Sequence, residues 1–293
     1  MAARARATRA APAKTKKTGA RKPVWKGVAK REGKRTRQRR FRRLAIVYDI
    51  EGPHVRLGML WFLVELIAML GGVWGLTLLY APTAAVAAMQ TSVALRKAGR
   101  KPDRLVAGAG AALVVIAGAI TTGMVGVAIL GLATAAMLVA IQRSATSRRK
   151  VPPVVDAAAT VRSALFVGFA VACLIVTARF SLGAAIALIF LVAAYETGDY
   201  IVGSGAANPY EGPVAGATAI VVVTFAITAL GVKPLAFPTS FALGALACVL
   251  CPVGQLVASG VLPSVTAPAS ALRRLDSLLV LAPAWALAVG WLI

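Results

Sequence analysis

The stretch LGMLWFLVELIAMLGGVWGLTLLYAPTAAVAAMQTSVAL, residues 57–95, decides the class of this protein. It has 39 residues and a single charged side chain, Glu65. At a rise of about 1.5 Å per residue it would extend roughly 58 Å as one helix, about twice the hydrocarbon thickness of a bilayer. The stretch therefore predicts two consecutive membrane-crossing helices.

The composition of the whole chain agrees with this interpretation. Of the 293 residues, 59% are hydrophobic, the mean hydropathy is +0.78 and the formal net charge is +23. A water-soluble globule could neither bury that much apolar surface nor distribute that much charge comfortably. Glycine and alanine dominate the apolar runs, as in helices that pack closely in lipid. We expect an all-α bundle of transmembrane helices.

Seven further spans are expected after the first two. Residues 105–141 are long enough to cross twice, and residues 158–195 form another pair that is interrupted at Arg179, Phe180 and Ser181. Three single spans are predicted at residues 213–230, 237–254 and 277–293. The predicted total is about nine.

The charge is concentrated at the N-terminus. Residues 1–43 carry 18 of the 33 Lys and Arg residues and one acid, Glu32. A segment with so little apolar content and so much like charge has no core that could offset ordering entropy, so disorder is expected. The predicted organisation is a basic tail at residues 1–45, N-terminal transmembrane helices at 46–156 and a C-terminal transmembrane domain at 157–293.

Two basic loops orient the predicted spans. The loops RKAGRKPDR, residues 96–104, and QRSATSRRK, residues 142–150, both fall on the side of the N-terminal tail. Excess Lys and Arg stays on the cytoplasmic side of a membrane, so the N-terminus is predicted to be cytoplasmic in a multi-pass protein of the cell membrane. Next to that membrane, the tail is suited to anionic lipid headgroups, whereas nucleic acid is a less favoured partner because it is not held nearby.

Several of the chain's few acids are predicted to lie at one membrane face. Glu196, Asp199, Glu211 and Asp276 follow or precede apolar runs that return to the cytoplasmic side. Converging carboxylates at such a boundary can bind divalent cations, which bridge phosphates. The alternative is that each acid is a helix cap or an ion-pair partner of Arg273 or Arg274. Glu65, inside the first span, is either functional or a hydrogen-bonded acid of the bundle.

Three blocks of sequence carry a family resemblance. YETGDYIVG, residues 195–203, looks like the segment D-[ST]-x-A-Y-x-x-G of the CDP-diacylglycerol synthases, also called phosphatidate cytidylyltransferases. PYEGPVAG, residues 209–216, looks like their K-T-W-E-G-x-x-G-G segment. GQLVAS, residues 254–259, followed by LRRLDSLL, residues 272–279, is similar to their signature, which begins G-D-L-x-x-S and ends L-D-R-x-D-S. The resemblance covers roughly residues 158–293.

The resemblance implies an enzyme of phospholipid biosynthesis. In that family a phosphatidate oxygen attacks the α-phosphorus of CTP, pyrophosphate leaves and CDP-diacylglycerol forms, with Mg²⁺ as cofactor. Carried over to this chain, Glu196 and Asp276 would be the catalytic, metal-holding acids. Four residues would bind the substrates: Ser259, Glu211, Arg273 and Arg274.

The chain departs from the family pattern at positions that carry the chemistry. Gln255 stands where the signature has an acid, and Arg273 stands where L-D-R has another. Two hypotheses follow: a cytidylyltransferase-like enzyme with an altered metal site, or a non-catalytic relative that serves as a membrane scaffold or binds lipid. The clustered acids favour the first, whereas Gln255 and Arg273 favour the second. A homodimer is compatible with either.

Overall fold

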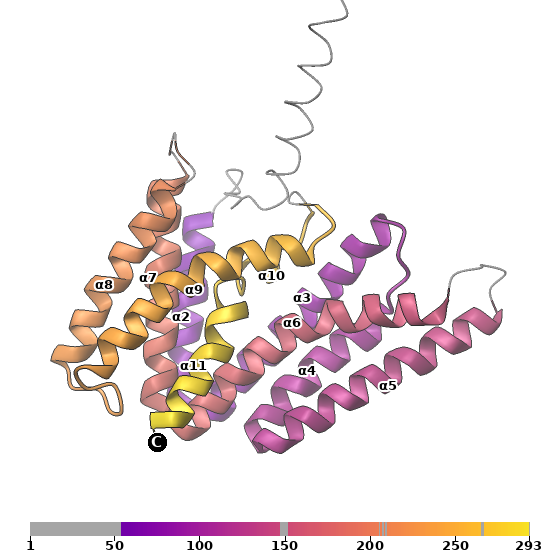
Figure 1. Cartoon of the computed structure of the whole chain (residues 1–293), viewed down its shortest axis with the longest axis horizontal. Coiled ribbons are helices and arrows are strands. Elements are labelled where there is room, and N and C mark those ends of the chain that lie inside the picture. The colour runs from indigo at the N-terminus through magenta and orange to yellow at the C-terminus, as the bar shows by residue number, and fades with distance from the viewer. Residues whose placement is uncertain are drawn as a thin grey trace, which may run out of the picture. The chain divides into compact units, whose positions relative to one another are not determined.

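The computed structural model describes residues 54–146, 152–204, 206, 208, 210–264 and 267–292, which belong to one compact unit. The predicted basic tail at residues 1–45 lies outside the described residues. Every regular element in the described part is a helix (Figure 1). In chain order these are α2 (His54–Leu70), α3 (Gly72–Lys97), α4 (Arg104–Ile120), α5 (Thr122–Thr146), α6 (Pro153–Phe180), α7 (Leu182–Gly203), α8 (Glu211–Ala229), α9 (Thr239–Val261), α10 (Ser270–Arg273) and α11 (Leu278–Leu292).

The long apolar stretch at residues 57–95 forms two helices, as predicted. Gly71 separates α2 from α3. Gly72 has φ +59°, a left-handed conformation that glycine adopts without strain. The two helices then fold back on one another, since the ring of Tyr80 on α3 meets Trp61 on α2 edge-on at 6.1 Å between centroids.

The interruptions predicted farther along the chain are also confirmed. Thr121 separates α4 from α5, and Ser181 separates α6 from α7. The Ser181 hydroxyl accepts a hydrogen bond from the backbone N–H of Ala184 (3.2 Å), and Asp103 accepts one from Val106 (2.8 Å), so a polar cap begins both α7 and α4. The predicted boundary between residues 156 and 157 falls inside α6, which packs against α3 and α4 as well as against α11.

Small residues bring the helices into close contact. At Gly168 on α6 an added Cβ would lie 3.1 Å from the Cα of Ala111 on α4, and at Gly198 on α7 it would lie 2.8 Å from the Ala215 carbonyl oxygen on α8. Such approaches of backbone to backbone are open only to glycine. The abundance of glycine and alanine therefore sets the spacing of this bundle.

One predicted boundary is wrong. The span predicted at residues 237–254 ends near Gly254, but α9 continues to Val261. Residues 255–261 contain no proline, and the next proline, Pro263, follows the helix end. Gln255 and Ser259 consequently lie within a packed helix and not in a cytoplasmic loop.

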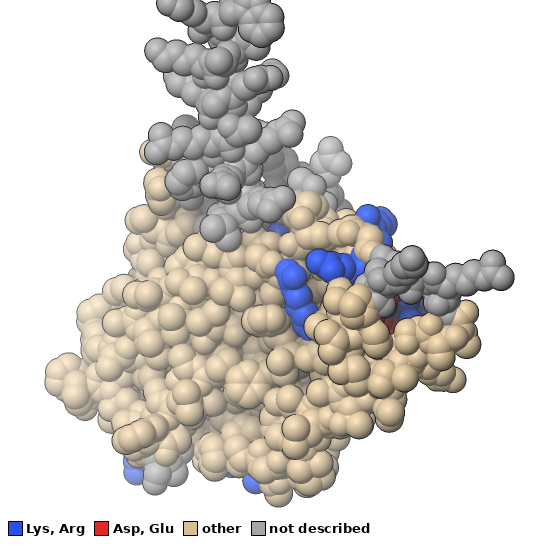
Figure 2. All heavy atoms as spheres, turned by 45° about the vertical axis from the view of Figure 1, so that its right-hand side comes forward, with Lys and Arg blue, Asp and Glu red and all other residues tan. Residues whose placement is uncertain are grey.

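The helices give the protein the character of a multi-pass membrane protein. Within the described residues, six helices are long and apolar enough to cross a membrane, and three shorter apolar helices accompany them, at Gly58–Leu70, Arg104–Ile120 and Leu278–Leu292. On the face drawn in Figure 2, Lys and Arg side chains gather from the centre to the upper right, a few more stand at the lower margin, and the broad area at the left and below carries no visible charged side chain. The nine apolar helices stand where nine spans were predicted, but nine complete crossings remain a prediction.

The predicted orientation has a direct test. Reporter fusions at residue 150 and at Ile293 should report opposite sides of the membrane, because five predicted crossings separate them and the basic loops are predicted to stay inside. Reporters on the same side at both positions would show that the number of crossings is wrong.

Candidate functional site

A cluster of buried and partly buried polar side chains lies where six segments of the chain meet. We call this the polar cluster. The residues come from α2, α3, α7, α9, α10 and the segment that joins α10 to α11. They are Glu65, Tyr80, Tyr195, Glu196, Asp199, Gln255, Ser259, Arg273, Arg274, Asp276 and Ser277.

Glu65 belongs to α2, which forms a hairpin with α3. Its Oε1 accepts a hydrogen bond of 2.6 Å from the Tyr80 hydroxyl, and both side chains are buried. Arg274 comes close to the same hairpin, since a Cβ added to Gly58 on α2 would lie 3.4 Å from the Arg274 Nη1. The acid of the first apolar stretch is therefore held in the bundle by a hydrogen bond, with a guanidinium charge nearby.

Tyr195, Gln255 and Asp199 form a chain of hydrogen bonds between α7 and α9. Gln255 donates from Nε2 to Asp199 Oδ2 (2.9 Å) and accepts at Oε1 from the Tyr195 hydroxyl (3.2 Å). Tyr195 and Asp199 stand four residues apart, so they share one face of α7. The amide of Gln255 thus supplies a neutral donor to a buried carboxylate.

Glycine at position 254 makes room for the segment that carries Asp276. A Cβ at Gly254 would overlap the carbonyl oxygen of Asp276 and lie 3.0 Å from that of Ser277. Arg273, just before this turn, donates from Nη1 to Ser259 Oγ on α9 (3.0 Å). These contacts fix the turn at residues 274–277 against α9.

Burial sets the electrostatics of this turn. Asp276 is 7% exposed, and burial raises the pKa of its carboxyl to about 7, an effect that the positive charge of Arg273 opposes. Burial also lowers the pKa of the Arg273 guanidinium, while the charge of Asp276 opposes that change. The two side chains therefore stabilise each other's charged form in a poorly solvated place.

Glu196 is the acid with an incomplete set of partners. Its Oε1 is buried and, within the described part of the chain, has no hydrogen-bond partner. The charge of Glu196 interacts with those of Asp276, Glu65 and Arg274. A buried carboxylate oxygen without a donor costs free energy, so it marks a place where a cation, a proton or a ligand donor would be favourable.

Most residues predicted from the sequence come together here. Glu196, Asp276 and Arg274 interact through their charges, and Arg273 binds Ser259. Glu211 does not join the buried group, because it begins α8 with an exposed side chain. A helix start next to water is an ordinary position for an acid, where it complements the helix dipole.

Glu65, Tyr80 and Gln255 are residues of the cluster that the sequence analysis did not assign to the site. For Glu65 a signal existed, since a lone carboxylate within an apolar span is expensive and indicates a partner inside the bundle. No sequence pattern identifies Tyr80 as that partner. Gln255 was read as a missing acid, whereas the structure shows it bonded on both sides.

The polar cluster fits Mg²⁺ only with help from a ligand. Among the described residues no group of three or more His, Cys, Asp or Glu side chains could hold a metal ion. Mg²⁺ is commonly bound by one or two carboxylates together with substrate phosphates and water. Glu196, with its unpartnered oxygen, and Asp276 could supply those two carboxylates.

No protein-family model matches the chain, and no curated protein matches it either.

Proposed function

We propose that the polar cluster binds the phosphate groups of a nucleotide or a lipid at a membrane, in a protein that resembles the CDP-diacylglycerol synthases. The observation that carries the proposal is the buried, unpartnered Oε1 of Glu196 beside Asp276 and Arg274. Acids that can share a cation and guanidinium groups that can pair with phosphate oxygens are the two components of a phosphoryl-transfer site.

Each side chain has a role in this proposal. Glu196 and Asp276 would hold Mg²⁺, which when bound neutralises charge on the phosphates of CTP. Arg274 would hold the phosphate of phosphatidate, while Arg273 orients Ser259 on α9. Glu211, which begins α8, would contact substrate only from the exterior of the bundle.

The second candidate is a non-catalytic relative that binds lipid or serves as a membrane scaffold. The hydrogen bond from Gln255 to Asp199 favours it, because a protein amide occupies a carboxylate that could otherwise face a cation. Arg273 also brings positive charge next to Asp276. In this candidate, the Gln255 amide and the Arg273 guanidinium interact with the carboxylates in the place that a metal ion would otherwise take.

Purified protein with CTP, phosphatidate and Mg²⁺ should form CDP-diacylglycerol slowly or not at all. Losing two signature acids removes several kcal/mol of transition-state stabilisation, and about 1.4 kcal/mol corresponds to a tenfold change in rate. If product does form, Glu196→Gln and Asp276→Asn should each abolish it. Thr197→Ala, which alters an exposed neighbour on α7, should retain it.

Ligand binding separates the two candidates. Mg²⁺-dependent binding of CTP that both acid variants lose, without turnover, would support a site that holds nucleotide but does not react. Binding of phosphatidate alone, insensitive to Mg²⁺, would support the non-catalytic relative. Family-typical rates that survive both acid variants would show that other residues perform the reaction.

A further inference from the structure

A groove and a pocket lie along α5, and none of their lining residues belongs to the polar cluster. This helix is largely exposed: only Val125, Leu132, Ala136 and Ala140 are buried among its described residues. Between α4 and α5 runs a groove of about 480 Å³. Its walls are entirely apolar and include Leu113, Ile116 and Ile120 from α4 and Val127, Gly131 and Ala135 from α5.

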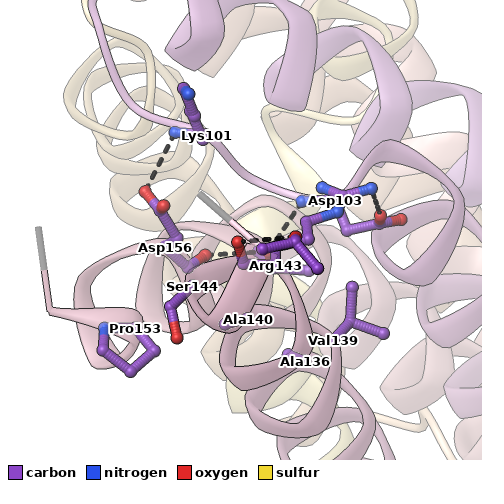
Figure 3. Close-up of a pocket in the computed structure, with 11 residues that line it drawn as sticks. Lys101, Asp103, Ala136, Val139, Ala140, Arg143, Ser144, Pro153 and Asp156 are labelled. Carbon is purple, nitrogen blue, oxygen red and sulfur yellow. Dashed lines mark hydrogen bonds and ion pairs between the residues drawn. The ribbon is translucent and has the colours of Figure 1, made fainter. Parts of the chain in front are cut away.

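A polar pocket of about 250 Å³ lies at the end of α5 near the two basic loops. Figure 3 shows Asp103, Arg143, Ser144 and Asp156 around it, with Ala136, Val139 and Ala140 along α5. Lys101 lies at its edge, with its backbone N–H toward Asp156 and its side chain turned outward. The pocket therefore has a charged rim and an apolar wall.

The pocket and the groove follow one another along α5. Leu132 and Ala135 line the groove, and Ala136 and Val139, within the next turn, line the pocket. Val106 also lines the groove and packs against the small cluster that contains Ala136 and Ala140. A single elongated molecule could thus occupy both.

The acids of the pocket are engaged in holding the fold. Asp103 caps α4 through Oδ1, which accepts from the Val106 N–H (2.8 Å), and pairs through Oδ2 with Arg143. Asp156 Oδ1 accepts from the backbone N–H of Lys101 (3.1 Å). Both Asp103 oxygens are consequently occupied by protein donors, and Asp156 uses one of its two oxygens in the same way.

The basic side chains keep donors available. Lys101 is exposed, and its ammonium makes no ion pair with any described residue. The Arg143 side chain is 53% exposed and uses Nη2 for Asp103, which leaves other N–H groups of its planar fork toward the pocket and solvent. Phosphate oxygens are the natural acceptors for such donors.

We propose that this composite site binds one phospholipid, with the phosphate at Lys101 and Arg143 and an acyl chain in the groove between α4 and α5. An apolar groove that ends at cationic donors near the basic loops matches a lipid with a phosphate headgroup. A soluble phosphate compound would leave the groove empty. An apolar helix of a second copy would leave the Lys101 and Arg143 donors without acceptors.

The test uses the purified full-length chain in detergent, with phosphatidylglycerol as the probe and native mass spectrometry to count retained lipid. Gly131→Leu fills the groove at a position where an added Cβ meets nothing within 4 Å. Gly126→Leu is its control, because it is equally open and on the same helix but does not line the groove. Lys101→Gln removes one phosphate donor, and Arg104→Gln removes an exposed charge nearby that does not line the pocket.

Wild type and both controls should retain one phosphatidylglycerol per chain. Gly131→Leu and Lys101→Gln should each weaken retention about tenfold, which corresponds to about 1.4 kcal/mol. Diacylglycerol with the same acyl chains and inorganic phosphate alone should both bind much more weakly. Equal retention by all variants, or equal retention of diacylglycerol, would overturn the proposal. So would a Gly131→Leu variant that loses a dimer while it keeps its lipid, since the groove would then be an interface between copies.

Discussion

Gln255→Leu should lower the free energy of unfolding by about 3 kcal/mol, because it removes a donor from a buried carboxylate and an acceptor from a buried hydroxyl in one step. In the wild type, Gln255 lies 2.9 Å from Asp199 Oδ2 and 3.2 Å from the Tyr195 hydroxyl. Leucine fills a similar volume but offers neither group a hydrogen bond. Chemical denaturation of the purified protein in detergent micelles would measure the loss.

A double-mutant cycle shows whether the hydrogen bond to Asp199 is responsible. Asp199→Asn converts the carboxylate to an amide that is much less costly to leave without the Gln255 donor, so Gln255→Leu should cost distinctly less in that background. Tyr195→Phe should cost only about 1 kcal/mol, the usual net value of one neutral hydrogen bond. Effects that add within about 0.5 kcal/mol would show that Gln255 stabilises the protein in some other way.

Gly254→Ala should destabilise the protein by about 1–3 kcal/mol and weaken ligand binding at the polar cluster, because overpacking displaces whatever the new methyl group meets. Here it would meet the backbone carbonyls of Asp276 and Ser277, which cannot rotate away as a flexible side chain would. The turn that carries Asp276 must then move. Thermal unfolding in detergent and nucleotide or lipid titration would record the two effects.

Gly260→Ala is the matched control for this prediction. Gly260 belongs to the same helix, and an added Cβ there meets nothing within 4 Å. Alanine favours a helix over glycine by up to about 1 kcal/mol, so this variant should be neutral or more stable. If both alanine variants unfold at the wild-type temperature, close contact at Gly254 does not position Asp276.

Much of the helical architecture could be predicted because it depends on local sequence. Runs too long for one crossing had to break, and the breaks occur at Gly71, Thr121 and Ser181, where glycine or a capping hydroxyl offers an alternative to helix continuation. The end of α9 was missed because Gln255 and Ser259 resemble loop residues. Their polar groups are satisfied by side chains from α7 and α10, which local sequence cannot reveal.

The candidate site was predictable in part. The acids of α7 and of the segment before α11 could be selected as residues at the ends of apolar runs, and their charges do interact. Glu211 met the same criterion and is exposed, because a helix start can face either solvent or the bundle. The hydrogen bond from Tyr80 to Glu65 depends on how α2 packs against α3, which no local sequence pattern specifies.

The hydrogen bond between Tyr80 and Glu65 has a consequence for how the chain is made. The partners belong to the consecutive helices α2 and α3, so the acid of this apolar hairpin can be hydrogen-bonded as soon as both helices are made. Asp276 is synthesised about 200 residues later, which at about 5–20 residues per second is roughly ten to forty seconds of translation. The Glu65 carboxylate therefore does not depend on the last helices for this hydrogen bond.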